Sequence, residues 1–177
     1  MVGEYTPMHS QNWVDQDVIR MADTNFLGAL RVLGACMPSF VSRDNGHIVI
    51  VGSLAGFTGL QGAIGYGASK AALMHLSENI SSDLYKMNIK VQLFNPGFVE
   101  TRLTEKNSFH MPFKMSAEKA AGIIARGMLT KRRVINFPWF FSLVFRFGKF
   151  LPNKFMIFGK KYVIFGKHAL YLNVSYV

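Results

Sequence analysis

The sequence predicts an α/β fold built on part of a doubly wound parallel sheet. Residues 47–51 and 89–94 are apolar runs without polar alternation, as in strands that are buried on both faces of a parallel sheet. Helical patterns separate these runs, which gives the strand–helix–strand rhythm of such sheets. The 177 residues suit one domain with a modest core, and a hydrophobic content of 50% excludes the disordered class.

The first half of the chain predicts a long helix, a turn and a buried strand. Apolar residues recur at helical spacing from Asn12 to Asp23 and onward towards Pro38. This pattern fits one long helix, or two turns of loop followed by a helix. Residues 43–46, Arg-Asp-Asn-Gly, have the composition of a turn. The strand at 47–51 follows and ends at Gly52-Ser53.

A glycine-rich loop, residues 54–65, leads into the next predicted helix at 66–87. Alanine, a strong helix former, is frequent in the first part of that helix. The spacing places one set of apolar residues on a single side of it: Ala68, Ala71, Ala72, Leu76, Ile80 and Leu84.

The third stretch predicts a strand, a helix and a last strand. Residues 89–94 form the strand, which Asn95-Pro96-Gly97 interrupts. Ser116 is the expected N-cap of a helix over 117–128. A third strand is predicted at 134–137.

Charge is divided unevenly along the chain, whose formal net charge is +10. Residues 1–118 contain 9 Lys and Arg against 10 Asp and Glu, whereas residues 119–177 contain 11 Lys and Arg and no acid. We therefore expect a catalytic body at 1–136 and a basic, aromatic tail at 137–177. The single cysteine, Cys36, favours a reducing cytoplasm and is expected to be a small buried residue.

Aromatic residues and cations are interleaved over residues 137–165. Pro138 and Pro152 bracket one short helical piece, and the longest uncharged stretch, 134–145, has 12 residues, too few to span a bilayer. One interpretation is an interfacial segment peripheral to a membrane. The other is a substrate lid or a subunit interface. Nucleic acid is the least favoured partner, because no recognition motif accompanies the basic residues.

Ser53, Tyr66 and Lys70 form the pattern that carries chemistry. Ser53 follows a buried strand, and ligands bind at the carboxyl edge of open α/β sheets. Tyr66 and Lys70, four residues apart at a helix start, share one helical face. A nearby ammonium group and the helix N-terminus are expected to lower the pKa of the phenol, which would let Tyr66 exchange a proton near neutral pH. No histidine has metal-like spacing, so no metal site is predicted.

Four motifs resemble those of the short-chain dehydrogenase/reductase family. Residues 66–70, Tyr-Gly-Ala-Ser-Lys, resemble its Tyr-x-x-x-Lys signature, and residues 52–56 resemble its serine strand end. Asn25 resembles the family's helix asparagine, and residues 95–101 resemble its Pro-Gly motif. The resemblance covers roughly residues 1–135 and implies a Rossmann-like sheet.

The resemblance also implies an oxidoreductase that uses NAD or NADP and acts on an alcohol or carbonyl, which could be lipophilic. Tyr66 would then be the acid/base, Lys70 would also bind the nicotinamide ribose, Ser53 would polarise the carbonyl and Asn25 would hold a water of a proton relay. Pro96, Gly97 and Thr101 would line the nicotinamide. Relatives commonly form homo-oligomers through the helices around Asn25 and Tyr66.

The family's Gly-x-x-x-Gly-x-Gly turn, which receives the cofactor's pyrophosphate, does not occur in this sequence. The motifs present correspond to the family's fold after its fourth strand. We therefore expect a partial sheet of two or three strands in which 47–51 is an edge. One hypothesis is a fragment of an enzyme. The alternative is a cofactor-deficient, non-catalytic protein that associates with relatives or with a membrane surface.

Overall fold

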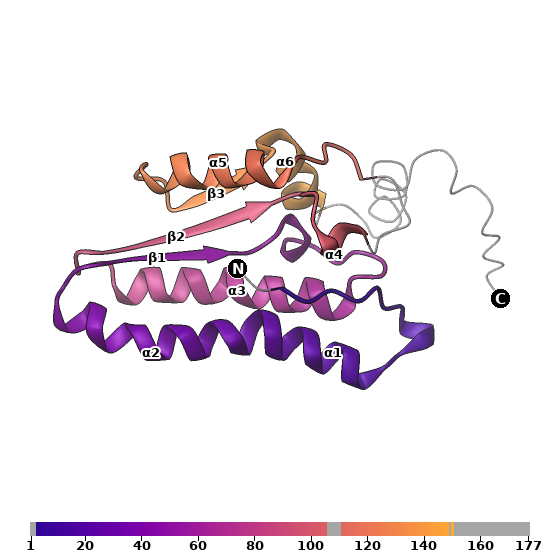
Figure 1. The fold of residues 1–177 in the computed structure, drawn as a ribbon, viewed down its shortest axis with the longest axis horizontal. Helices are drawn as coiled ribbons and strands as arrows, with labels where there is room; N and C mark the ends of the chain where they lie inside the picture. Colours follow the sequence, from indigo (N-terminus) through magenta and orange to yellow (C-terminus); the bar gives the residue numbers. More distant parts are fainter. Residues whose placement is uncertain (1–2, 106–110, 149, 151–177) are drawn as a thin grey trace.

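The computed structural model describes residues 3–105, 111–148 and 150. Its parallel sheet has the order β1-β2-β3, formed by β1 (Gly46–Val51), β2 (Ile89–Pro96) and β3 (Val134–Phe137). Helices α1, α2 and α3 lie on one side of the sheet and α5 on the other (Figure 1). The predicted α/β class and the expected partial sheet of two or three strands with an edge at 47–51 are confirmed by the three strands observed.

Helices connect the strands and cover the sheet. Their bounds are α1 (Asp15–Ala22), α2 (Gly28–Ser42), α3 (Ile64–Asp83), α4 (Arg102–Glu105), α5 (Ala117–Met128) and α6 (Trp139–Gly148), with short 3-10 turns at Ser10–Asn12 and Leu54–Gly56.

The long predicted helix exists, but a π-helical stretch, Asp23–Leu27, joins α1 to α2. Helix α2 continues past Pro38 to Ser42. The proline ring removes one hydrogen bond of the helix ladder, which leaves the carbonyl of Gly34 without its usual donor. Gly34 and Pro38 are both exposed, so water can take that donor's place.

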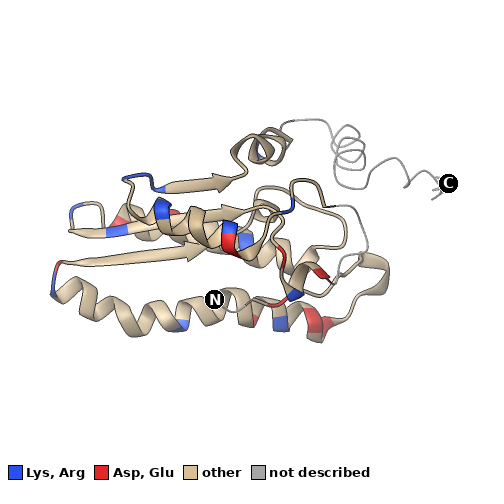
Figure 2. Cartoon of the chain, turned by 45° about the horizontal axis from the view of Figure 1, so that its top comes forward, with Lys and Arg blue, Asp and Glu red and all other residues tan. Residues whose placement is uncertain are grey.

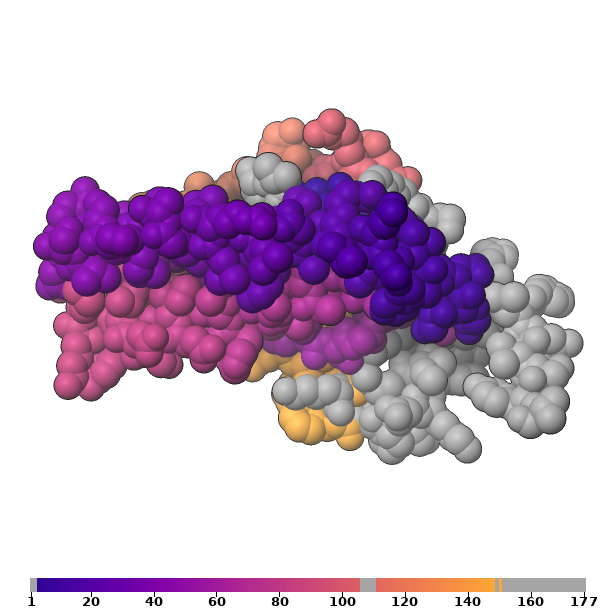
Figure 3. Space-filling model, turned by 90° about the horizontal axis from the view of Figure 1, so that it is seen from below, coloured from indigo at the N-terminus to yellow at the C-terminus, as the bar shows by residue number. Residues whose placement is uncertain are grey.

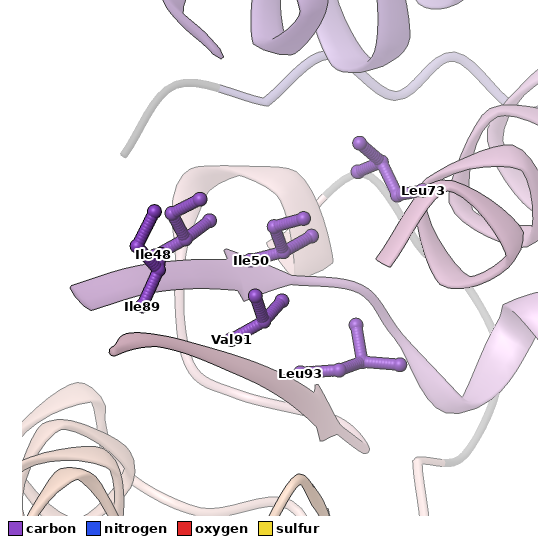
Figure 4. Close-up of a cluster of buried hydrophobic side chains, with 6 residues drawn as sticks. All are labelled: Ile48, Ile50, Leu73, Ile89, Val91 and Leu93. Carbon is purple, nitrogen blue, oxygen red and sulfur yellow. The ribbon is translucent and has the colours of Figure 1, made fainter. Parts of the chain in front are cut away.

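The main core lies between the sheet and α3. Figure 4 shows Ile48 and Ile50 of β1 on the same side as Leu73 of α3. Every residue of β2 from Val91 to Asn95 is buried, as predicted for a strand covered on both faces. The same prediction is wrong for β1, where only Ile48 and Ile50 are buried, because β1 is the edge of the described sheet and α5 packs on β2.

The predicted apolar side of α3 is confirmed only in part, since Leu76, Ile80 and Leu84 pack against the core. Ala68 is exposed, and α3 contacts the sheet on one side and α1 on another. A helix packed on two sides has no single apolar stripe, which is why periodicity misplaced the buried positions. These positions are Gly65, Ser69, Lys70, Leu73 and Ser77.

The outer surface of α2 is exposed along its length. Figure 3 shows α1 and α2 as an indigo-to-purple row beside the magenta α3. Cys36 lies on this surface and is exposed, so the prediction of a small buried cysteine is wrong. Sequence pattern could not separate the two surfaces of α2, because apolar side chains occupy both; Val32 is 64% exposed.

Helix α5 begins as predicted, with the hydroxyl of Ser116 accepting a hydrogen bond from the Lys119 N–H. Helix α6 packs on β3 and on the 3-10 turn, where Phe141 and Phe145 are buried beside Leu54. The first helix of the predicted tail therefore belongs to the folded body. Residues 151–165 of that tail lie outside the described residues, and the domain boundary at 136/137 stays a prediction. No helix in the described ranges is long and apolar enough to cross a membrane.

Candidate active site

The candidate site lies at the carboxyl edge of the sheet. Ser53 follows β1 and caps the 3-10 turn at Leu54–Gly56, with its hydroxyl accepting from the Ala55 N–H at 3.2 Å. The chain then enters α3 at Ile64, so Tyr66 and Lys70 occupy its first two turns. Close packing of the turn on α3 holds these parts together, since a Cβ on Gly56 would approach the Lys70 carbonyl carbon to 2.9 Å.

The Ser53 side chain lies beside the Tyr66 phenol and favours its ionised form. Burial raises the pKa of the Tyr66 phenol, and the neighbouring Ser53 side chain opposes that rise only in part. The expected lowering of this pKa by Lys70 is therefore wrong for the structure as described. Burial destabilises the phenolate by desolvation more than the Ser53 side chain stabilises it.

Lys70 is buried, with 6% of its surface exposed. Its ammonium donates to the carbonyl of Val51, the last residue of β1, at 3.1 Å. The same nitrogen lies 5.7 Å from the centre of the Tyr66 ring. Burial lowers the pKa of Lys70 from 10.5 to about 8. Both titrating groups of the site are thus shifted towards their neutral forms.

Asn25 lies in the π-helical stretch and is buried. Its amide group donates to the Glu4 carbonyl at 2.9 Å and to the Ser69 hydroxyl at 3.0 Å. The Ser69 hydroxyl in turn donates to the Tyr66 carbonyl at 2.8 Å. Asn25 therefore connects the N-terminal segment to the turn of α3 that carries Tyr66. Such π-helical turns occur often at functional sites.

Two residues near the site were missed by sequence reasoning. The ring of Tyr5 stands edge-on to Tyr66, with ring centres 5.3 Å apart. The pKa of Tyr5 is raised, mainly by burial and to a lesser extent by the negative charge of an ionised Tyr66. No sequence signal identifies Tyr5, because the contact depends on the path of the N-terminal segment. Asn95 is fully buried and donates to the Asn136 side chain at 2.9 Å, while its Oδ1 has no hydrogen-bond partner.

The predicted nicotinamide-lining residues follow β2. Pro96 and Gly97 lie at the carboxyl end of that strand, and the Gly97 N–H donates to the Phe137 carbonyl at 2.8 Å. Thr101 is exposed, and its carbonyl accepts the Thr104 and Glu105 N–H groups that begin α4. The structure thus brings Ser53 close to Tyr66, whereas the hydrogen bonds of Thr101 run to its own turn.

An apolar, aromatic wall stands next to Ser53. Leu54, Phe141 and Phe145 are buried in one cluster, against which Phe57, Leu60 and Phe98 pack. Phe113, which has a positive φ of 58°, adds its ring 5.3 Å from that of Phe141. The segment Met111–Met115 thus reaches this wall.

The hydroxyls of Ser53 and Tyr66 and the ammonium of Lys70 are hydrogen-bond donors gathered at one sheet edge. This donor set suits ligands that present hydroxyl or carbonyl oxygens, such as a ribose or an alcohol. It therefore fits the nicotinamide half of a dinucleotide. The given sequence contains no glycine-rich turn of the kind that binds a dinucleotide's pyrophosphate.

Comparisons with known proteins agree with these motifs. The family model described as short chain dehydrogenase matches residues 2–111. An uncharacterized oxidoreductase of Myxococcus xanthus is 41% identical over 131 residues, 74% of this chain and 52% of that protein. Human 17-beta-hydroxysteroid dehydrogenase 13 is 29% identical over 143 residues, 79% of this chain and 48% of that protein. The chain spans about half the length of these curated relatives.

A solved structure shares the fold. A short chain dehydrogenase from Burkholderia cenocepacia, in complex with NADP, matches with a TM-score of 0.74 at 18% identity. The match covers 84% of this chain and 63% of that one.

Proposed function

This chain belongs to the short-chain dehydrogenase family, and on that premise we propose that it carries the proton-transfer site of a nicotinamide-dependent oxidoreductase acting on an alcohol or carbonyl. The observation that supports the proposal is that the side chains of Ser53 and Tyr66 gather beside the buried ammonium of Lys70. These groups lie at the sheet edge where α/β enzymes bind their ligands.

The described residues would handle the substrate oxygen. Tyr66, whose pKa is raised by burial, holds its proton at neutral pH and would give it to a carbonyl oxygen during reduction. Ser53 would donate a second hydrogen bond to that oxygen as charge develops on it. In oxidation the Tyr66 phenol would first release its own proton to solvent, and the phenolate oxygen would then take the proton of the alcohol. Asn25 would position Tyr66 through Ser69.

The cofactor supplies or accepts the hydride when it is bound. Lys70 would donate to the nicotinamide ribose with ammonium hydrogens that Val51 does not use. Pro96, Gly97 and Thr101 would line the nicotinamide, as the family's Pro-Gly motif suggests.

The proposed substrate is lipophilic. The partly buried Phe57 and Phe98, which pack on Leu54 next to Ser53, would contact carbon rather than polar groups. The name of the human relative, a hydroxysteroid dehydrogenase, points the same way. The gathered Ser53, Tyr66 and Lys70 favour catalysis over the non-catalytic alternative.

A homo-oligomer and a cytoplasmic location remain predictions. Exposed apolar side chains on the outer surface of α1 and α2 support the first of these, among them Ile19 and Val32 at 65% and 64% exposure.

A matched pair of tyrosine variants tests the function. Turnover of secondary alcohols and ketones would be followed by nicotinamide absorbance with NAD and NADP. Tyr66→Phe is expected to lower kcat at least about 100-fold, since it removes the exchanged proton and little volume. Tyr85→Phe, at a 66% exposed tyrosine just after α3, is the control and should match wild type. Turnover that survives in Tyr66→Phe would reject the assignment, as would a wild-type protein that turns over no alcohol or ketone.

A further inference from the structure

Helix α6 is apolar on both of its sides. Phe141 and Phe145 face the body of the protein and are buried. Phe140, Val144 and Phe147, at i, i+4 and i+7, lie on the opposite side. An amphipathic surface helix would present polar residues there. A helix that carries large apolar side chains on a solvent-facing side is instead covered there, by protein or by lipid.

The uncovered side forms a continuous patch with a neighbouring loop. The ring of Phe113 lies 4.8 Å from that of Phe140, edge to face. The exposed fractions are 70% for Trp139, 44% for Phe140, 40% for Val144, 62% for Phe147 and 53% for Phe113. We call these five residues the outer aromatic face.

The charge of α6 and of the residues around it indicates which kind of partner would bind this face. Helix α6 contains Arg146, which is exposed, and no acidic residue. Figure 2 shows α6 almost entirely tan, without red. Residues 119–177 contain 11 Lys and Arg and no acid. A second copy that met this face with its own α6 would place its Arg146 near this one, so repulsion opposes that pairing.

An anionic bilayer surface suits both the exposed aromatic side chains and the positive charge of this part of the chain. Tryptophan and phenylalanine lie favourably at the boundary between headgroups and acyl chains, and each nearby cation gains from anionic lipid. From these contacts and charges we propose that the outer aromatic face of α6 binds the surface of a bilayer that contains anionic lipid. This binding does not depend on the proposed oxidoreductase activity.

The face also adjoins the candidate active site. Phe141, on the inner side of α6, packs on Leu54, which directly follows Ser53. Phe113 contacts both Phe140 of the outer face and Phe141 of the inner side. If the proposed function holds, an apolar substrate dissolved in the bilayer would enter the site beside this loop.

Vesicle partitioning of the full chain tests the proposal. The vesicles are phosphatidylcholine alone and phosphatidylcholine with phosphatidylserine. The wild-type chain is expected to co-sediment with the phosphatidylserine vesicles, more weakly at high salt. Trp139→Ser with Phe147→Ser should lower its partition coefficient at least about tenfold, because two exposed aromatic anchors are lost. The matched control is Ile19→Ser with Val32→Ser, which removes apolar side chains of similar exposure from α1 and α2 and should leave partitioning unchanged.

Fluorescence locates the contact. The chain has two tryptophans, so Trp13→Phe leaves Trp139 as the reporter, and its emission should shift to the blue with phosphatidylserine vesicles. Equal partitioning of the two double variants would overturn the proposal. Vesicle binding without a change in Trp139 emission would do the same, since it would move the contact elsewhere in the chain. Self-association without lipid that disappears in Trp139→Ser with Phe147→Ser would replace the bilayer by a second copy.

Discussion

Tyr66 and Lys70 lie four residues apart, and burial shifts both pKa values towards the neutral forms. The phenol pKa is raised, and the ammonium pKa is lowered to about 8. At neutral pH the phenol of Tyr66 is therefore protonated. Lys70 beside it is still charged, but its pKa of about 8 lies much closer to neutral pH than that of an ordinary lysine. Such a pair is suited to give up and regain a proton at a substrate oxygen.

The lowered pKa of Lys70 predicts a pH dependence of stability. Above about pH 8 the folded chain releases the lysine proton, whereas the unfolded chain keeps it until about pH 10.5. Since the unfolded state binds more protons in this window, the free energy of unfolding rises with pH. We expect a rise of about 1.5 kcal/mol between pH 8 and about pH 9.5, below the range where buried tyrosines reverse the trend.

Denaturant titrations at several pH values measure this rise. Lys70→Met should abolish it, because the titrating group is gone. Lys86→Met, which removes an exposed lysine just after α3, should keep the wild-type slope. A slope that is the same in Lys70→Met and in wild type would show that another group causes it.

At this scale the sequence predicted which residues meet but not how they titrate. The strand end at Ser53 and the four-residue spacing from Tyr66 to Lys70 follow from backbone periodicity, so their gathering was predictable. The pKa of Tyr66 depends on burial, which only the packed structure shows. Tyr5 and Asn95 were missed for the same reason, since both contact the site through tertiary packing.

Among the secondary-structure elements, β1 and β2 approach closely where they end. Gly52 directly follows β1, and a Cβ there would collide with Oδ1 of the buried Asn95 and approach Leu93 Cδ1 to 3.3 Å. Asn95 is held by Asn136 of β3 and cannot move aside freely. Gly52 is therefore needed because another side chain occupies the space of its missing Cβ.

Two alanine variants test this packing. Gly52→Ala should lower the free energy of unfolding by about 2 kcal/mol through overpacking. Gly34→Ala, on the exposed side of α2 with nothing within 4 Å of the added Cβ, should raise it by about 1 kcal/mol, because alanine favours helix. Urea denaturation measures both changes. A neutral Gly52→Ala would mean that Asn95 repacks without cost.

Local signals explain which elements were predictable. Ser116 and the β-branched residues of β1 act within a few residues of themselves, so the start of α5 and the strand were found. The π-helical stretch at Asp23–Leu27 has no sequence signature, and the buried side of α3 depends on its contact with α1. The position of α6 follows from Phe141 reaching Leu54, a contact between residues 87 positions apart in the sequence.

The whole molecule has an asymmetric sheet. Within the described residues β1 pairs only with β2, so one side of β1 presents ladder hydrogen-bonding groups without a strand partner. Edge strands of this kind favour pairing with another strand. The candidate site lies at the carboxyl end of the same strand, so a strand added at this edge would also border Ser53.

The central claim about the whole molecule is that it supports hydride transfer between an alcohol or carbonyl and a nicotinamide cofactor. The most direct measurement uses a secondary alcohol deuterated at its hydroxyl-bearing carbon, incubated with the protein and NAD or NADP, with mass analysis of the nicotinamide product. The account predicts deuterium on the reduced nicotinamide with the wild-type protein and none with Tyr66→Phe. A wild-type protein that binds both cofactor and alcohol but moves no deuterium would contradict it.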